Sequence, residues 1–258
     1  MIIAIDIGNT HTDIGVVDLT ARVCRERTTF VSSEIEIHLV PVIRGLMYKY
    51  HEQLKAIAAS SVIRSARFKV NGICADIKAP SPIWVEYSPE LPVKITYEDP
   101  TVLGADRIAN LMYGFVMRPR TPTVIVDAGT TVTIDLLSAA GEFCGGIIVP
   151  GVITQLKSLH THTAQLPKLS LENIQAKFPG TSTSRCMVAG ACASVAGAIN
   201  VAVKRFEQIC NCDCTVFATG GTFKYTADFL ECSYEYVPDL TILGVAFCAN
   251  HSTNNSVC

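Results

Sequence analysis

The strongest constraint on this chain is a motif that occurs twice. Residues 2–12 read IIAIDIGNTHT and residues 123–133 read TVIVDAGTTVT. In both copies an apolar, largely β-branched run ends in an aspartate, and a glycine and small hydroxyl residues follow. The aspartates, Asp6 and Asp127, lie 127 − 6 = 121 positions apart, close to half of the 258 residues. This spacing predicts two similar lobes.

The motif has the chemistry of a phosphate and metal site. Glycine lets the backbone approach a phosphate closely, and exposed N–H groups in a turn favour anions. An aspartate at a strand end can hold a hydrated cation that neutralises phosphate charge. A single copy is explained equally well as a β-turn with an Asx hydrogen bond. Because the motif is repeated, we expect two loops that close on one nucleotide.

Composition narrows the class of protein. Hydrophobic residues make up 49% of the chain and charged residues 17%, with a net charge of −2, which describes a soluble globular protein. Such a balance gives no support for a nucleic-acid partner. Met1 leads directly into an apolar strand, so we expect no signal peptide and a cytoplasmic protein. The uncharged stretch 186–203 is too polar for a membrane span and predicts a closely packed helix.

Eleven cysteines are an unusual number for this length. A disulfide framework suits small secreted chains rather than one like this. Their only cluster is Cys210, Cys212 and Cys214. Zinc sites space paired cysteines by two to four residues and need a second pair, which is missing here. A turn with reduced thiols is therefore favoured over a metal site.

Hydrophobic periodicity predicts strands and helices in the same order in both halves. The expected strands cover 2–6, 12–17, 22–30 and 56–61, then 123–127, 131–137, 143–148 and 215–218. The expected helices cover 34–50, 67–77 and 105–117, then a mainly helical segment to about 207, one helix after Gly221 and a last one at 240–249. This order is typical of the actin-like ATPase (ribonuclease H-like) fold, an α/β class with mixed sheets. The expected lobes are 1–118 and 119–258.

A second candidate site begins at residue 103, where Leu-Gly-Ala-Asp-Arg precedes an apolar helix. An acid at a helix start can simply complement the helix dipole, but Arg107 at that position is slightly unfavourable. Asp106 can accept a hydroxyl proton, and Arg107 can bind a carboxylate. Together they predict a site for a phosphoryl acceptor.

Two glycine-rich segments and a histidine pair complete the polar features. Gly145 and Gly146 are explained by a bulge or close packing as well as by a ligand. Residues 219–222, Thr-Gly-Gly-Thr, follow a strand, and no Gly-Lys-Ser/Thr follows, so this is not a Walker loop. In an actin-like protein this position approaches adenosine. His160 and His162 lack a third ligand and are predicted to lie on the surface.

These residues resemble one family closely. The shared motifs, in order, are Asp6-x-Gly8-Asn9-Thr10, Tyr97-x-x-Pro100-x-x-Leu103-Gly104-Ala105-Asp106-Arg107, Asp127-Ala128-Gly129-Thr130, Gly145-Gly146-x-Ile148-x-Pro150-Gly151 and Thr163-Ala164-x-Leu166-Pro167. They look like those of type III pantothenate kinase and span nearly the whole chain. The resemblance implies ATP-dependent phosphorylation of pantothenate, the first step toward coenzyme A. It also implies a homodimer that completes the acceptor site and needs Mg²⁺ and a monovalent cation.

The resemblance also implies roles for single residues. The ATP contacts would be Asp6, Ile7, Gly8, Asn9, Thr10, His11, Thr12, Asp13 and Thr130. The pantothenate contacts would be Tyr97, Gly104, Ala105, Asp106, Arg107 and Thr183, with Asp106 as the base. Asp127 would bind K⁺ or NH₄⁺, and Asp6 would hold Mg²⁺ through water. One position departs from the family pattern, because Ser182 stands where asparagine is usual.

Two other functions are compatible with the fold. A catalytically silent relative would bind a ligand and regulate transcription or another protein, but a regulator has no need of Asp6, Asp106, Arg107 and Asp127 together. A phosphohydrolase that acts on polyphosphate would need a basic channel, and a net charge of −2 does not favour one.

Overall fold

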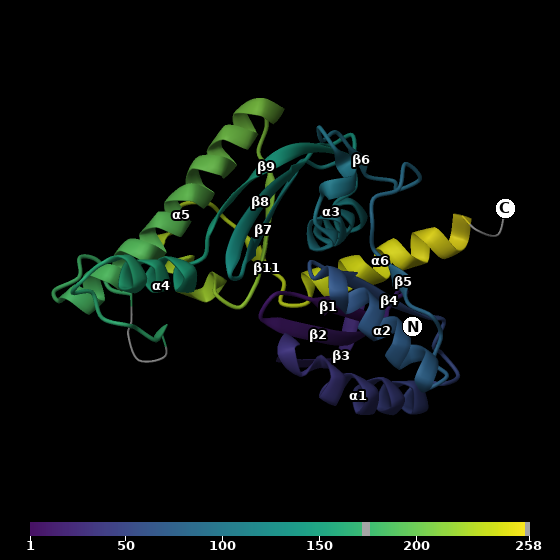
Figure 1. Ribbon diagram of the computed structural model, residues 1–258. Helices are drawn as coiled ribbons and strands as arrows, with labels where there is room; N and C mark the ends of the chain where they lie inside the picture. Colours follow the sequence, from purple (N-terminus) through teal and green to yellow (C-terminus); the bar gives the residue numbers. More distant parts are fainter. Residues whose placement is uncertain (172–175, 256–258) are drawn as a thin grey trace. The chain divides into compact units, whose positions relative to one another are not determined.

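The computed structural model describes residues 1–171 and 176–255 (Figure 1). The chain forms two compact units. The first comprises Met1–Pro119, Gly141–Phe143 and Asp239–Cys258, and the second comprises Arg120–Ala140 and Cys144–Pro238. The lobes 1–118 and 119–258 remain a prediction from the sequence. The two units have other boundaries, since the last helix belongs to the first unit.

The sheet of the first unit has the strand order β3-β2-β1-β4-β5. Strand β1 is antiparallel to β2 and parallel to β4. The strands are β1 (Ile2–Ile7), β2 (His11–Asp18), β3 (Val23–Val31), β4 (Ala56–Ser61) and β5 (Ile83–Trp84). Side chains alternate between the two faces of a strand. Ile3, Ile5 and Ile7 therefore share one face of β1, and Asp6 lies on the other face.

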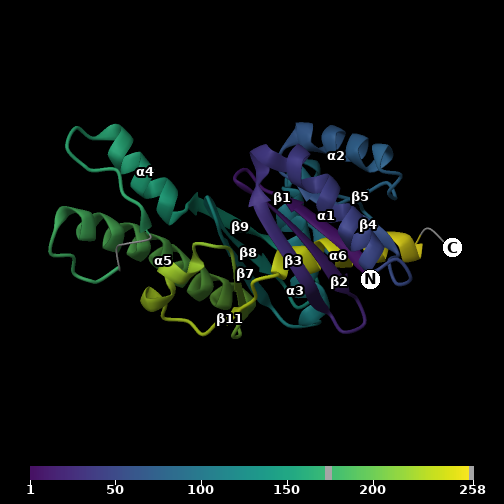
Figure 2. The ribbon, with the colours of Figure 1, turned by 90° about the horizontal axis from the view of Figure 1, so that it is seen from below.

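Helices cover both faces of this sheet. α1 (Ile35–Lys49) and α2 (Arg64–Asp76) bury Leu39 and Val70 against the isoleucines of β1. α6 (Leu240–Asn255) packs on the opposite face and against α3 (Ala105–Met117). Figure 1 shows α1 and α6 on opposite sides of β1 to β3, and Figure 2 shows α1 in front of these strands and α6 behind them.

Two glycines let α6 approach its neighbours closely. A Cβ on Gly244 would lie 2.0 Å from the carbonyl oxygen of Ala109 in α3. A Cβ on Gly15 of β2 would lie 2.8 Å from a methyl carbon of Ile242 in α6. Packing at these distances leaves no space for a larger residue. The last helix is thus an integral layer of the first unit.

The second unit repeats the strand order of the first. Its strands are β7 (Thr123–Ala128), β8 (Thr131–Leu137), β9 (Glu142–Pro150), β10 (Thr215–Thr219) and β11 (Glu235–Tyr236). They lie in the order β9-β8-β7-β10-β11, and β6 (Lys94–Ile95) extends the sheet by pairing with the first residues of β9. β7 is antiparallel to β8 and parallel to β10, as β1 is to β2 and β4. This equivalence confirms the predicted duplication.

Two helices cover one face of the second sheet. α4 (Val152–His162) and α5 (Thr183–Cys210) pack on a core built from β7, β8 and β10 (Figure 1). By length and composition α5 could cross a membrane, but 56% of its apolar 18-residue stretch is buried inside the protein. A mostly buried helix is typical of the core of a soluble protein. The predicted packed helix at 186–203 is confirmed as part of α5.

One helix prediction is wrong. After Gly221 the chain forms two short 3₁₀ turns, Phe223–Tyr225 and Ala227–Phe229, and no α-helix. The hydroxyl of Thr226, buried at the junction of these turns, donates to the carbonyl oxygen of Phe223 at 2.8 Å. Such bonds compete with the helical hydrogen-bond ladder.

The cysteine cluster forms the predicted turn. α5 ends at Cys210, Asn211 adopts the left-handed conformation, and β10 begins at Thr215. Burial is the largest cause that raises the pKa of Cys214 to about 12, and the neighbouring Cys210 adds to the shift. The thiol of Cys214 therefore stays protonated at neutral pH. Across residues 1–171 and 176–255 no three His, Cys, Asp or Glu side chains converge as a metal site.

Candidate active site

The first motif places Asp6 in a polar row across the sheet. The register pairs Asp6 with Asp13 on β2 and with Ser60 on β4, and pairs Asp13 with Thr29 on β3. The hydroxyl of Ser60 donates to Asp6 Oδ1 at 2.5 Å. Carboxylates directly opposite each other repel, so both need partners. The carboxylate and hydroxyl oxygens of this row are the hard ligands that fit Mg²⁺ and its waters.

Asp13 is held by one cation and one hydroxyl from the neighbouring strand β3. The guanidinium of Arg27 donates to Asp13 Oδ1 at 2.9 Å and to Asp239 Oδ1 at 3.1 Å, and the hydroxyl of Thr29 also donates to Asp13. Burial opposes the charge of Arg27, but Asp13 and Asp239 outweigh it and raise the pKa of Arg27. Arg27 was not predicted from the sequence, because its partners are brought to it only by the fold.

The turn after Asp6 is closed by its own backbone. The N–H of Gly8 donates to the carbonyl oxygen of His11 at 3.0 Å, and the hydroxyl of Ser32 donates to the Gly8 carbonyl at 2.7 Å. Ile7 and Thr12 are buried, so they can offer a nucleotide only backbone groups. The exposed side chains of this turn are Asn9, Thr10 and His11, and Thr130 in the second motif is also exposed.

The second motif builds a similar but less charged row. Asp127 is paired with Thr133 on β8 and Thr219 on β10. The hairpin turn here is one residue shorter than in the first motif, because Ala128 pairs with Val132 whereas Ile7 pairs with Thr12. As a result, Asp127 faces a threonine where Asp6 faces a second aspartate. One carboxylate among neutral hydroxyls and carbonyls has the donor set and the charge that suit a monovalent cation.

Neighbouring loops hold the turn that contains Thr130. The carbonyl oxygen of Thr130 accepts the N–H of Gly151 at 3.0 Å and the hydroxyl of Thr154 at 2.5 Å. A Cβ on Gly151 would lie 2.2 Å from the carbonyl of Gly129. Gly220 has φ +94°, and its Cβ would lie 2.3 Å from the carbonyl of Ala128. Gly151 and the segment 219–222 therefore pack against this turn, whereas a Cβ on Gly146 would meet the carboxylate of Asp135 on β8.

The acceptor motif forms the first turn of α3. Asp106 Oδ1 accepts the backbone N–H of Arg107 at 2.8 Å, and a Cβ on Gly104 would lie 2.4 Å from the same oxygen. A side chain at position 104 would therefore displace the Asp106 carboxylate from this place. Burial raises the pKa of Asp106, although the N–H and the charge of Arg107 oppose the shift. A desolvated carboxylate of raised pKa is better suited to accept a proton than an ordinary aspartate.

Two aromatic rings lie against the side chain of Arg107. Its guanidinium carbon is 6.0 Å from the ring centroid of Tyr97 and 5.4 Å from that of Phe143, and the two rings stack at 5.9 Å. The structure therefore brings together Tyr97 and Arg107, both predicted to contact pantothenate. Phe143 was missed, because nothing in its sequence context distinguishes it from a core residue of strand β9.

Thr183 is the first residue of α5, and Ser182 is its N-cap. The hydroxyl of Ser182 accepts the backbone N–H of Arg185 at 3.4 Å. Serine and asparagine cap helices about equally well, so the departure at Ser182 preserves the local structure. A Cβ on Gly180 would lie 2.4 Å from the backbone nitrogen of Cys186, which explains the glycine in this loop.

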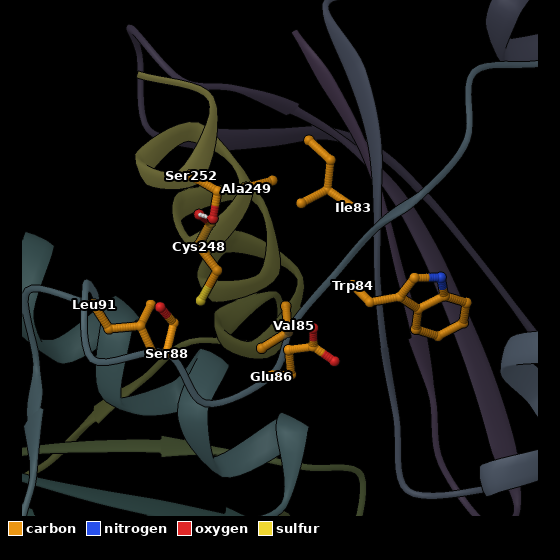
Figure 3. A pocket seen from close by; sticks show the side chains of 9 residues that line it. All are labelled: Ile83, Trp84, Val85, Glu86, Ser88, Leu91, Cys248, Ala249 and Ser252. Carbon is orange, nitrogen blue, oxygen red and sulfur yellow. Dashed lines mark hydrogen bonds between the residues drawn. The ribbon is translucent and has the colours of Figure 1, made fainter. Parts of the chain in front are cut away.

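A separate cavity of about 270 Å³ in the first unit contains none of the predicted site residues. Figure 3 shows side chains from the segment around Trp84 and from α6 around it. They are Ile83, Trp84, Val85, Glu86, Ser88, Leu91, Cys248, Ala249 and Ser252.

Solved structures of low sequence identity confirm the actin-like fold. A Campylobacter jejuni protein described as a Baf family transcriptional activator matches with a TM-score of 0.59 and 19% identity, over 98% of this chain and 99% of its own. A ROK hexokinase from Thermus thermophilus matches with a TM-score of 0.54 and 12% identity, over 98% and 99%. At these identities the likeness shows the fold alone.

Sequence relatives are more specific. A type III pantothenate kinase of Desulfatibacillum aliphaticivorans is 30% identical over 259 aligned residues, which cover 99% of this chain and 100% of the relative. One from Frankia casuarinae is 32% identical, with 95% and 97% covered. The family model "Type III pantothenate kinase" matches residues 2–205. The chain therefore belongs to the type III pantothenate kinase family.

Proposed function

We propose a division of roles among the residues of this kinase, which phosphorylates pantothenate with ATP in the first step of coenzyme A biosynthesis. The observation that carries the proposal is the first turn of α3. There a partly buried carboxylate of raised pKa, Asp106, lies next to an arginine held against two aromatic rings. An alcohol that bears a carboxylate needs these two groups in an acceptor site.

Asp106 is the general base. Phosphoryl transfer depends mainly on positioning the alcohol in line with the γ-phosphate and on neutralising charge. The proton of the pantothenate primary hydroxyl passes to the Asp106 carboxylate as the oxygen attacks the γ-phosphorus, whose bond to the bridging oxygen breaks so that ADP leaves. Desolvation strengthens this carboxylate as a base, while the N–H of Arg107 fixes one of its oxygens.

Arg107 binds the carboxylate of pantothenate. Charge-assisted bonds from a guanidinium to a carboxylate are short and often bidentate. The side chain is 7% exposed, so an anion bound there is screened little by water. Tyr97, Gly104, Ala105 and Thr183 complete the proposed pantothenate contacts.

ATP and a divalent cation are assigned to the first motif. The carboxylate of Asp6 holds Mg²⁺ through water, and the ion supplies positive charge to the phosphates. The exposed Asn9, Thr10 and His11 offer side-chain donors, whereas Ile7, Gly8 and Thr12 contribute backbone groups. Asp13 acts through Arg27, to which it is paired, and Thr130 provides a further ATP contact.

The monovalent cation, K⁺ or NH₄⁺, is assigned to Asp127. Its row contains one carboxylate and two threonines, so the donor set fits a single positive charge. A cation there adds positive charge near the phosphates.

The working unit is proposed to be a cytoplasmic homodimer. The second unit exposes large apolar side chains that a partner subunit would cover, among them Ile148 (57%), Ile153 (53%) and Val201 (62%). Light scattering that showed an active monomer would contradict the dimer.

One assay tests the assignment of substrate and cation. ATP consumption is measured with and without pantothenate, in potassium and in sodium. We expect consumption that depends on pantothenate and is faster in potassium. Hydrolysis of ATP at the same rate without pantothenate would indicate a phosphohydrolase instead.

A further inference from the structure

Of the two rings that lie against Arg107, that of Phe143 is the closer. Its ring centroid lies 5.4 Å from the guanidinium carbon, against 6.0 Å for Tyr97. The three groups form a nearly equilateral triangle, because the ring centroids are 5.9 Å apart. Arg107 therefore touches both π systems at once.

The ring of Phe143 is held in place by its surroundings. Its side chain is fully buried, whereas Tyr97 is 40% exposed. Its carbonyl oxygen accepts the hydroxyl of Thr96 at 2.5 Å, and Phe143 pairs with Ile95 where β6 meets β9. A ring fixed in this way offers a rigid surface, which a half-exposed tyrosine cannot match.

Arg107 needs such a surface. It lies in the first turn of a helix, where the dipole disfavours a cation, and its side chain is nearly buried. A guanidinium over an aromatic face is attracted by the ring quadrupole, and this attraction is stronger where water is excluded. The rings cover part of the guanidinium and limit its orientations, so less entropy is lost when an anion binds.

We propose that Phe143 is a positioning residue that holds Arg107 ready for a carboxylate and so sets the preference of the acceptor site for an acidic alcohol. The inference rests on the proposed role of Arg107. It adds Phe143, which lies at the start of strand β9 and outside the acceptor motif. It assigns this residue to selectivity for the acceptor rather than to proton transfer.

The test compares two acceptors, pantothenate and an analogue with an amide in place of the carboxylate, on purified full-length protein. In Phe143→Leu and Phe143→Met we expect KM for pantothenate to rise about threefold to thirtyfold. KM for the amide and kcat for both acceptors should change little. Phe247→Leu is the matched control, since Phe247 is also buried in the first unit and stacks on Tyr113. This control should leave the ratio of the two KM values unchanged.

Two outcomes would overturn the proposal. One is an equal rise in KM for both acceptors, which indicates a packing role. The other is an unchanged KM ratio in a variant whose thermal unfolding shows it to be folded. Two substitutions of different shape are used so that the failure of one to fold leaves the other to decide.

Arg107→Ala, alone and combined with Phe143→Leu, separates this inference from the proposed function. If Phe143 acts through Arg107, the leucine substitution should have no further effect on the KM ratio once Arg107 is absent. If Arg107→Ala itself leaves the ratio unchanged, the role of Arg107 in the proposed function is wrong. If it alters the ratio and Phe143→Leu does not, only the role of Phe143 is wrong.

Discussion

The hydroxyl of Ser60 donates a hydrogen bond of 2.5 Å to the carboxylate of Asp6 on the neighbouring parallel strand. Ser60 is fully buried, so the bond ties the Asp6 carboxylate, near the end of β1, to a hydroxyl that solvent does not reach. The bond fixes one oxygen of the carboxylate to which we assign Mg²⁺. The geometry of the row thus determines how Asp6 presents its charge.

Ser60→Ala should weaken the response to magnesium. Loss of a hydrogen bond that orients a metal ligand typically reduces metal affinity by about 10- to 100-fold. We expect a higher Mg²⁺ concentration at half-maximal rate and weaker Mn²⁺ binding in the presence of ATP, measured by titration calorimetry. Ser65→Ala, on the exposed surface of α2, is the control. Unchanged metal dependence would remove Asp6 from the magnesium site.

Asp106→Asn should bind both substrates but turn over slowly. Asparagine keeps the shape of the side chain and cannot accept the hydroxyl proton, a role worth about 10²–10⁴-fold in rate. Calorimetry should show near-normal binding of ATP and pantothenate, while steady-state kinetics show the loss. A turnover close to that of the wild type would move the base to another residue.

The same substitution should stabilise the protein in a pH-dependent way. Burial raises the pKa of Asp106 above its unfolded value, so ionisation destabilises the folded state at neutral pH. Removing the carboxyl group should therefore raise Tm near pH 7. The gain should disappear as the pH falls below the unfolded value of about 3.9, where both states are protonated. A lower Tm at pH 7 would contradict the direction of the shift.

Asp127→Ala should abolish activation by a monovalent cation. We expect the wild type to be faster in potassium or ammonium than in sodium, because the larger ions match a site built from one carboxylate and neutral oxygens. Initial rates at constant ionic strength separate specific binding from screening. An enzyme indifferent to the cation, or a variant that still responds to it, would rule out this assignment.

Two glycine substitutions should change stability in opposite directions. Gly244→Ala places a Cβ 2.0 Å from the Ala109 carbonyl, and overpacking of this kind destabilises by about 1–3 kcal/mol. Gly45 lies exposed in α1 with nothing within 4 Å of its Cβ position, so Gly45→Ala should stabilise by about 0.5–1 kcal/mol. Denaturant unfolding measures both. A neutral Gly244→Ala would mean that α3 and α6 can separate without loss of packing.

The sequence predicts the local features of this fold well. Asp6 and Asp127 each lie one residue before the end of a buried strand, because β-branched runs followed by glycine determine a strand and a turn within a few residues. The repeat of the motif also predicted the repeat of the sheet order. The acceptor motif was found because Asp106 and Arg107 are adjacent in the chain.

Features that depend on tertiary contact could not be predicted. Arg27 meets Asp239 across 212 positions of sequence, and Phe143 meets Arg107 only through the pairing of β6 with β9. The shorter second hairpin, which sets Asp127 opposite Thr133, depends on strand register rather than on motif spacing. The missing helix after Gly221 reflects a buried threonine, whose hydroxyl bonds are not evident from periodicity.

The assignment of α6 to the first unit has a consequence for biosynthesis. A chain leaves the ribosome from its N-terminus, and domains generally fold as units. Here strands β1 to β5 are made early, but the helix that seals one of their faces, with Gly244 against Ala109 and Ile242 against Gly15, is translated only after all strands of the second unit. Until Leu240–Asn255 emerges, Ala4 and its neighbours on that face lack their cover. The nascent first unit thus keeps this apolar face uncovered until the second unit has been translated, and the second unit can complete its own core sooner.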